Sequence, residues 1–305
     1  MNYLHVSPAP HIHSGLTTQK VMLDVIIALA PSAIVSVVLF KLKALWLILA
    51  CVAAAVLCEF VFNLIVKKKQ TVSDLSAVVT GLILALNLSA NVKIWQAVCG
   101  SVFAIIIVKS LFGGLGKNIV NPAIGARVFM LLTFASVAGG ANPDLSTGAT
   151  PLAVLKEGLD GAPSILNLFL GNVGGTIGET CAIAILLGYA YLVIRKQIKW
   201  YVPCAFIGTV FVCYLVYSQS IVMAVSQVLA GGLLFGAVFM ATDYVTTPIS
   251  NLGKVVFCVG CGLITFAIRA FGAFPEGVSI SILCMNLLTP LIEKVTKPRT
   301  LGGIK

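Results

Sequence analysis

One short stretch, Asp144 to Pro151, combines an acid, three hydroxyls and two small residues in the order Asp-Leu-Ser-Thr-Gly-Ala-Thr-Pro. A threonine hydroxyl is a poor nucleophile unless a base activates it. The stretch contains no histidine, and Lys156 lies six residues beyond Thr150, so chemistry at Thr150 needs an external enzyme. By its residues alone the stretch also fits an ordinary turn, in which Asp144 bonds backbone amides and Gly148 accepts a positive φ.

Four charged side chains fall inside apolar runs: Asp24, Glu59, Arg127 and Asp243. A charge at the centre of a membrane helix costs about 2.5–3.5 kcal/mol on insertion scales. Such residues mark ion paths or structural pairs, and the sequence leaves both roles open. We therefore treat Asp24, Glu59 and Asp243 as candidates for an ion pathway, with an interfacial position as the alternative for Asp24.

A second group of polar residues follows a glycine-rich segment that begins at Gly113. Asn118, Asn121 and Arg127 offer donors to a polar or anionic ligand. The alternative is a helix-entry loop in which Pro122 occupies the first turn. Spacing alone favours the loop.

These residues must be positioned by membrane helices. The chain has 305 residues, of which 59% are hydrophobic and 10% charged, whereas soluble domains carry about 25% charged residues. The net charge of +10 comes from short basic clusters between apolar runs, which argues against a nucleic-acid surface. The segment before residue 16 lacks the basic start of a signal peptide.

The apolar runs predict an all-α polytopic membrane protein, since a spanning helix needs about 20 apolar residues. We expect about ten transmembrane helices, at residues 21–40, 45–66, 75–88, 94–111, 120–138, 177–194, 201–217, 221–241, 255–270 and 278–292. With both termini cytoplasmic, fourteen basic residues fall in inner loops and five in outer loops. The positive-inside rule favours this orientation.

The expected organisation is a cytoplasmic segment (1–20), a first membrane repeat (21–138), an extracytoplasmic loop (139–174), a second membrane repeat (175–293) and a cytoplasmic tail (294–305). The repeats rest on two matches: Gly81 parallels Gly236, and Phe112 parallels Phe271, at offsets of 155 and 159 residues. Because the offset spans five helices, the two five-helix repeats must be inverted. Chance similarity between glycine-rich stretches is the alternative.

Both repeats contain a broken helix. The apolar run that ends at Leu88 is too short to span a bilayer, and Asp243 with its neighbouring hydroxyls interrupts the matching run. Unwound backbone is tolerated in a membrane only where it is buried or lines a cavity. The pattern therefore predicts a site between the halves.

The nine cysteines lie in or beside apolar runs and are expected to be small buried hydrophobes. Cys258 and Cys261 form a Cys-x-x-Cys pair, but it lies within an expected helix and has no second pair. We predict no metal site.

The sequence resembles the D subunits of Rnf electron transport complexes, which are related to the B subunit of the sodium-translocating NADH:quinone reductase. The resemblance covers nearly the whole chain, including Ser7 to His11, Met22 to Leu29, Asn118 to Arg127 and Phe239 to Asp243. Its most specific part is Asp144-x-x-Thr147-Gly148-Ala149-Thr150, which looks like the signature that a flavin transferase recognises outside the cytoplasm.

The resemblance implies that Thr150 carries flavin mononucleotide (FMN) through a phosphoester bond, with Asp144, Thr147, Gly148 and Ala149 as the recognition motif. A second, noncovalent flavin such as riboflavin is compatible with it, and we assign Asn118, Asn121 and Arg127 as candidates for a flavin pocket. The implied partners are a flavin transferase and Rnf subunits A, B, C, E and G, which would hold the ferredoxin and NAD sites.

The implied activity is that of a cytoplasmic-membrane subunit of a ferredoxin:NAD+ oxidoreductase, which relays electrons through the flavin and couples them to Na+ or H+ translocation. Alone, the chain would not be an active enzyme. A stand-alone secondary transporter or channel without flavin is the main alternative, and a structural membrane anchor for redox partners is a third.

Overall fold

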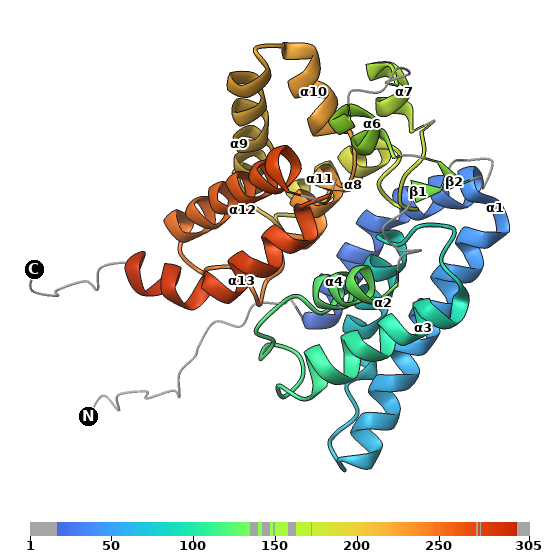
Figure 1. Cartoon of the computed structure of the whole chain (residues 1–305). Coiled ribbons are helices and arrows are strands. Elements are labelled where there is room, and N and C mark those ends of the chain that lie inside the picture. The colour runs from blue at the N-terminus through green and yellow to red at the C-terminus, as the bar shows by residue number, and fades with distance from the viewer. Residues whose placement is uncertain are drawn as a thin grey trace, which may run out of the picture.

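The computed structural model describes residues 17–134, 140–141, 147–148, 150–157, 163–171, 173–272, 274 and 276–297. These residues are helical or form connecting turns, apart from the two-residue strands β1 (Gly140–Ala141) and β2 (Thr147–Gly148), which pair antiparallel. The predicted all-α class is confirmed. In Figure 1 the helices of the first half lie together on one side and those of the second half on the other.

The first half begins with α1 (Thr18–Ile65), a 48-residue helix that breaks at Lys41, where φ is 55° and ψ is −146°. At 1.5 Å per residue its length is about 72 Å, roughly twice a bilayer core, so the break divides two spans. The rest of the half consists of a 3₁₀ turn, η1 (Val72–Asp74), then α2 (Ser76–Leu86), α3 (Ile94–Val102) with its π-helical continuation η2 (Phe103–Ser110), and α4 (Pro122–Thr133).

Two short helices follow the ribbon: α6 (Pro151–Glu157) and α7 (Ile165–Leu170). The segment expected to be a plain loop is therefore partly helical. The second half comprises α8 (Ala182–Ile194), α9 (Tyr201–Ser218), α10 (Ile221–Leu229), α11 (Leu233–Phe235) with the π-helical η3 (Gly236–Met240), α12 (Asn251–Phe271) and α13 (Val278–Val295).

Each of the ten predicted ranges overlaps a helix, but the ends differ. The fifth helix ends at Thr133 rather than near residue 138, and the sixth begins at Ala182 rather than Ile177. Among the described residues, four helices are long and apolar enough to cross a membrane, and a fifth is added if α10 and the α11–η3 segment, bent by 65°, form one span. A multi-pass membrane protein is confirmed, and the count of ten stays a prediction.

The two broken helices meet at the centre of the fold. α2 and the α11–η3 segment are almost fully buried, and the Asn87 amide at the end of α2 lies 3.3 Å from the Met240 sulfur at the end of η3. The carbonyls of Leu86 and Leu88 accept from the backbone of Gly178 and Ile177 at 2.6 and 2.8 Å. The end of the first broken helix is thus completed by the second half of the chain.

Two buried cations sit at corresponding places in the halves. Lys109 ends η2 and Arg269 lies in the last turn of α12, an offset of 160 residues. Glu59, which pairs with Lys109, and Tyr214, which lines a pocket with Arg269, are 155 residues apart. These offsets match the repeat predicted from sequence.

The burial of these cations corrects part of the charge count. The count places Lys109 on the inner side and Arg269 on the outer side, although both fall within predicted helices (94–111 and 255–270), and both are 2% exposed. Thirteen inner and four outer residues remain, so the preference for cytoplasmic termini is unchanged.

Candidate functional site

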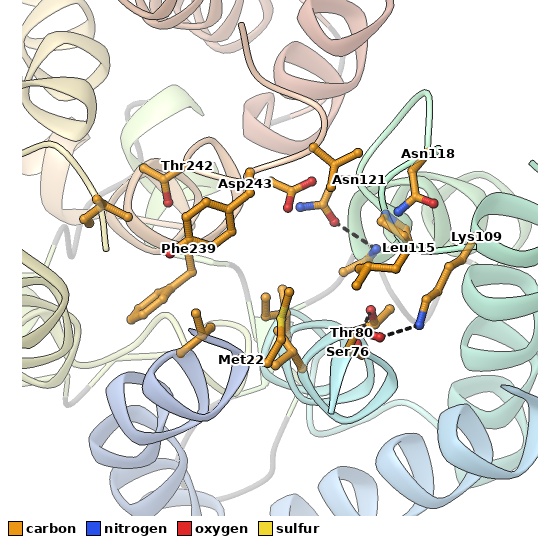
Figure 2. Close-up of a pocket in the computed structure, with 18 of the residues that line it drawn as sticks. Met22, Ser76, Thr80, Lys109, Leu115, Asn118, Asn121, Phe239, Thr242 and Asp243 are labelled. Atoms are coloured by element: carbon orange, nitrogen blue, oxygen red, sulfur yellow. Dashed lines mark hydrogen bonds between the residues drawn. The ribbon is translucent and has the colours of Figure 1, made fainter. Parts of the chain in front are cut away.

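One cavity lies between the two halves, where the sequence predicted a site. Its empty volume is about 750 Å³, a figure that includes the open mouth. The first half contributes Ser76, Thr80 and Lys109, and the second half contributes Phe239 and Asp243. Figure 2 shows these side chains on opposite walls of the cavity.

The start of α4 forms one wall. Asn121 caps α4 by accepting from the Ala123 amide at 3.0 Å, and Pro122 occupies the first turn, so the helix-entry interpretation of this segment is confirmed. The Asn121 side-chain nitrogen also donates to the Met240 carbonyl at 3.5 Å. The buried Oδ1 of Asn118 has no partner among the described residues, and this acceptor is available to a ligand.

The loop after η3 forms the facing wall. Asp243 accepts from the Thr246 hydroxyl at 2.9 Å. When the Asn286 side-chain amide of α13 is oriented so that both of its polar atoms are bonded, its oxygen accepts from the backbone N–H of Asn121 at 3.2 Å. Its nitrogen then donates to the Thr246 carbonyl at 3.3 Å. A single α13 residue therefore ties both walls together.

The three candidate acids have different surroundings. Asp24, in α1, pairs with Arg195 at 3.1 Å and accepts from Tyr191 and Gln197 at 3.0 and 2.8 Å. These contacts lock α1 to the end of α8. Asp24 has the geometry of a structural pair.

Glu59 is also paired. Its carboxylate lies 2.8 Å from Lys109 Nζ and accepts from the Thr71 hydroxyl at 2.6 Å. Lys109 donates further to the Ser76 hydroxyl at 2.8 Å and lines the cavity. Of the three acids, Asp243 alone lines the cavity and belongs to none of the ion pairs of the described residues.

Arg127 is separate from the two asparagines of its proposed pocket. It is 1% exposed, does not line the cavity, and pairs with Glu276 at 2.8 Å. Glu276 and the buried Glu179 were both missed in the sequence. Each lies next to a glycine outside a helix, in Gly178-Glu179 and Glu276-Gly277, and acids in glycine-rich breaks of an apolar chain were the available signal.

Thr150 begins α6 and is half-buried. Its hydroxyl accepts from the Ala153 amide at 3.2 Å, as a helix cap does. Leu152 packs in a small apolar cluster with Leu168 and Ala230, and Lys156 donates to the Gly272 and Phe274 carbonyls. α6 is therefore fixed to α7 and to the second half.

Part of the recognition motif is outside the described residues. Asp144 and Ala149 fall there, and Thr147 and Gly148 are described only as backbone in β2. Cys258 and Cys261 are buried free thiols.

Comparison with known proteins identifies the family. The model of the NQR2, RnfD, RnfE family matches residues 5–302. The chain belongs to this family. Three members show its range: the D subunit of a Na+-translocating ferredoxin:NAD+ oxidoreductase complex from Acetobacterium woodii, its proton-translocating counterpart from Clostridium ljungdahlii, and the D subunit of an ion-translocating oxidoreductase complex from Stutzerimonas stutzeri.

The similarity to these NQR2, RnfD, RnfE family members extends over the whole chain. The Acetobacterium protein is 46% identical over 99% of this chain and 96% of its own length. The Clostridium protein is 38% identical over 99% and 97%, and the Stutzerimonas protein 37% identical over 94% and 92%. The predicted resemblance is confirmed.

Proposed function

We propose that this chain is the D subunit of an Rnf complex, an ion-translocating ferredoxin:NAD+ oxidoreductase of the cytoplasmic membrane. The full-length match to three D subunits carries the proposal. The chain would work with Rnf subunits A, B, C, E and G, which hold the ferredoxin and NAD+ sites. Both termini would face the cytoplasm, with the Thr150 segment on the opposite side.

We further propose that Thr150 carries FMN through a phosphoester bond made by a flavin transferase. The surroundings of Thr150 fit such a group, because this residue is only partly buried and its hydroxyl lies beside the first amides of α6, which favour a phosphate. A neighbouring pocket is lined by Lys156, Tyr214, Tyr217 and Arg269, and offers basic and aromatic side chains.

When bound, the flavin supplies the electron-transfer chemistry, and the protein contributes its position and electrostatics. Leu152 and Lys156 hold α6 in place, so the attached group would have a fixed base. Its tether would also keep it from being lost to the medium. For a noncovalent flavin such as riboflavin, the candidate contact is the cavity between the halves, where Asn118 offers an unpartnered acceptor.

The test of the flavin site is in-gel fluorescence and intact mass of the denatured protein, coexpressed with a flavin transferase. The wild type should fluoresce and gain the mass of one FMN less one water, and Thr150→Ala should lose both. Thr133→Ala is the control, since among the described residues that exposed hydroxyl donates to the Phe129 carbonyl of its own helix. A dark, unmodified wild type, with the transferase active on a known substrate, would refute the site.

For ion translocation we propose Asp243 as a cation ligand in the cavity. It is the candidate acid without an ion-pair partner there, and it follows the C-terminal end of η3, whose partial negative charge favours cations. Asp243→Asn should reduce ion transport per electron in proteoliposomes while ferredoxin:NAD+ electron transfer continues. Asp74→Asn, outside the cavity, should leave the ratio unchanged, and equal ratios in all three proteins would refute the role.

The two alternatives predict other outcomes. A stand-alone transporter would move substrate as an isolated chain and carry no flavin. A structural anchor would leave the complex fully active after Thr150→Ala.

A further inference from the structure

Four charged side chains, three of them buried and one, Glu276, 19% exposed, form a cluster between the cavity and α6. They come from four parts of the fold: Arg127 from α4, Glu179 from the segment before α8, Arg269 from the last turn of α12, and Glu276 from the segment before α13. We call these residues the four-charge cluster. The break between α10 and α11 lies among them.

Both carboxylates of the cluster face the same glycine. A Cβ atom built on Gly232 would collide with Glu179 Oε1, and would lie 2.8 Å from Glu179 Cδ and 3.0 Å from Glu276 Oε1. The glycine therefore lets two acids approach one point of the backbone. Two carboxylates in so small a space cannot both ionise without a strong cost.

The two arginines compensate only part of this charge. Arg127 pairs with Glu276 at 2.8 Å. Arg269 donates to the carbonyls of Gln227 and Ala230 at the end of α10, and its charge offsets that of a helix C-terminus. Glu179 belongs to none of the ion pairs of the described residues, although it is only 7% exposed.

Several buried polar atoms of the cluster have no partner among the described residues. The Nε and Nη1 atoms of Arg127, whose Nη2 holds Glu276, have no partner among the described residues although this side chain is 1% exposed. Glu276 Oε1, one of the oxygens that faces Gly232, is likewise unpartnered. A protonated Glu179 carboxyl could donate to that oxygen, whereas an ionised one has no donor to give.

A proton suits this site better than a metal cation. Within the described part of the chain, no group of three or more His, Cys, Asp and Glu side chains could hold a metal. The guanidinium groups of Arg127 and Arg269 oppose any added positive charge, including a proton. A proton, however, needs no set of ligands, and it removes the repulsion between the two carboxylates.

The cluster lies along a line from the cavity to the flavin-site helix. Arg127 follows Asn121, which lines the cavity, by six residues of α4, or about 9 Å at 1.5 Å per residue. On the other side, a Cβ on Gly231 would collide with Leu152 of α6 and lie 3.5 Å from Arg269 Nη2. In Figure 1 α6 lies close to α8 and α11.

From this arrangement we infer that Glu179 is a proton-binding site whose proton is shared with Glu276 Oε1, placed between the central cavity and α6. Its proton comes from water and returns to water, so no co-reactant is required. In an ion-translocating subunit, Glu179 would supply a protonatable group in addition to Asp243. The inference needs neither the flavin at Thr150 nor activity of the complex, and its test measures neither.

The test is infrared spectroscopy of the purified membrane complex during pH titration in H2O and D2O. A protonated carboxyl C=O band that shifts in D2O should be present near neutral pH and absent from Glu179→Gln. Glu276→Gln should shift the band, because it changes the acceptor. The control Glu293→Gln alters a partly exposed acid outside the cluster that accepts from the Ile249 amide and should leave the band unchanged.

A wild type without this band at neutral pH, or a band that survives Glu179→Gln, would overturn the inference. So would a band that NaCl removes at constant pH, since Na+ would then be the bound cation. If Glu179→Gln fails to assemble, labelling of the wild type with dicyclohexylcarbodiimide decides. This reagent modifies protonated carboxyls, so mass spectrometry should find it on Glu179 and not on Glu293, and the reverse pattern would contradict the assignment.

Discussion

Removing one member of the buried pair between Glu59 and Lys109 should destabilise the protein strongly. Their atoms are 2.8 Å apart, and the two side chains are 5% and 3% exposed. Lys109→Met leaves the Glu59 carboxylate with the Thr71 hydroxyl as its remaining donor among the described hydrogen bonds. Breaking a buried pair from one side costs about 3–5 kcal/mol, or roughly two to three and a half powers of ten in the folding equilibrium.

The double variant Glu59→Gln, Lys109→Met separates the cost of an uncompensated charge from the loss of contacts. The glutamine oxygen still accepts from Thr71, and no charge remains, so we expect the double variant to recover at least half of the loss. The assay is unfolding of purified protein in mixed micelles, followed by tryptophan fluorescence. A Lys109→Met protein within about 1 kcal/mol of wild type, or losses that simply add, would refute the pairing argument. If the stability losses of the two substitutions simply add, Glu59 would also become a candidate for ion transport again.

Two further predictions concern helix positions and α6. Gly188→Ala in α8 should cost about 1–3 kcal/mol of stability, because the new Cβ would collide with the Ala28 carbonyl of α1. Gly208→Ala in α9, which has open space around it, should be neutral or slightly stabilising. Equal losses in the same micelle assay would contradict the tight α1–α8 contact. Lys156→Met removes the hydrogen bonds from the Lys156 side chain to the Gly272 and Phe274 carbonyls. It should therefore speed hydrogen exchange of α6 amides but not of α9 amides. Unchanged exchange in α6 would show that apolar packing alone holds α6 in place.

The sequence predicted the helices because apolar runs in a membrane protein leave few alternatives. It also predicted a site at the two broken helices, and Asn118, Asn121 and Asp243 do share a cavity. Both inferences depend on features that are local in the chain. The break at Lys41 also follows from a local feature, because it lies between the two predicted helices 21–40 and 45–66.

Pairings between distant residues could not be predicted in this way. Arg127 looked like a neighbour of Asn121, yet its partner Glu276 is 149 residues away. The charge count groups Lys109 and Arg269 with the charges at the membrane surface because each lies near the end of a predicted helix. Their burial depends on Glu59 in one case and on the end of α10 in the other, and neither partner is visible from local composition.

The contact between the end of α2 and the segment before α8 has a consequence for biogenesis. When a ribosome has made only the first half, the carbonyls of Leu86 and Leu88 lack the donors that Ile177 and Gly178 later provide. Within lipid each such group costs several kcal/mol, so the nascent first half cannot reach its final packing before translation passes Gly178. Residues 1–170 expressed alone should be degraded, and coexpressed residues 171–305 should rescue them if the halves complete each other after synthesis.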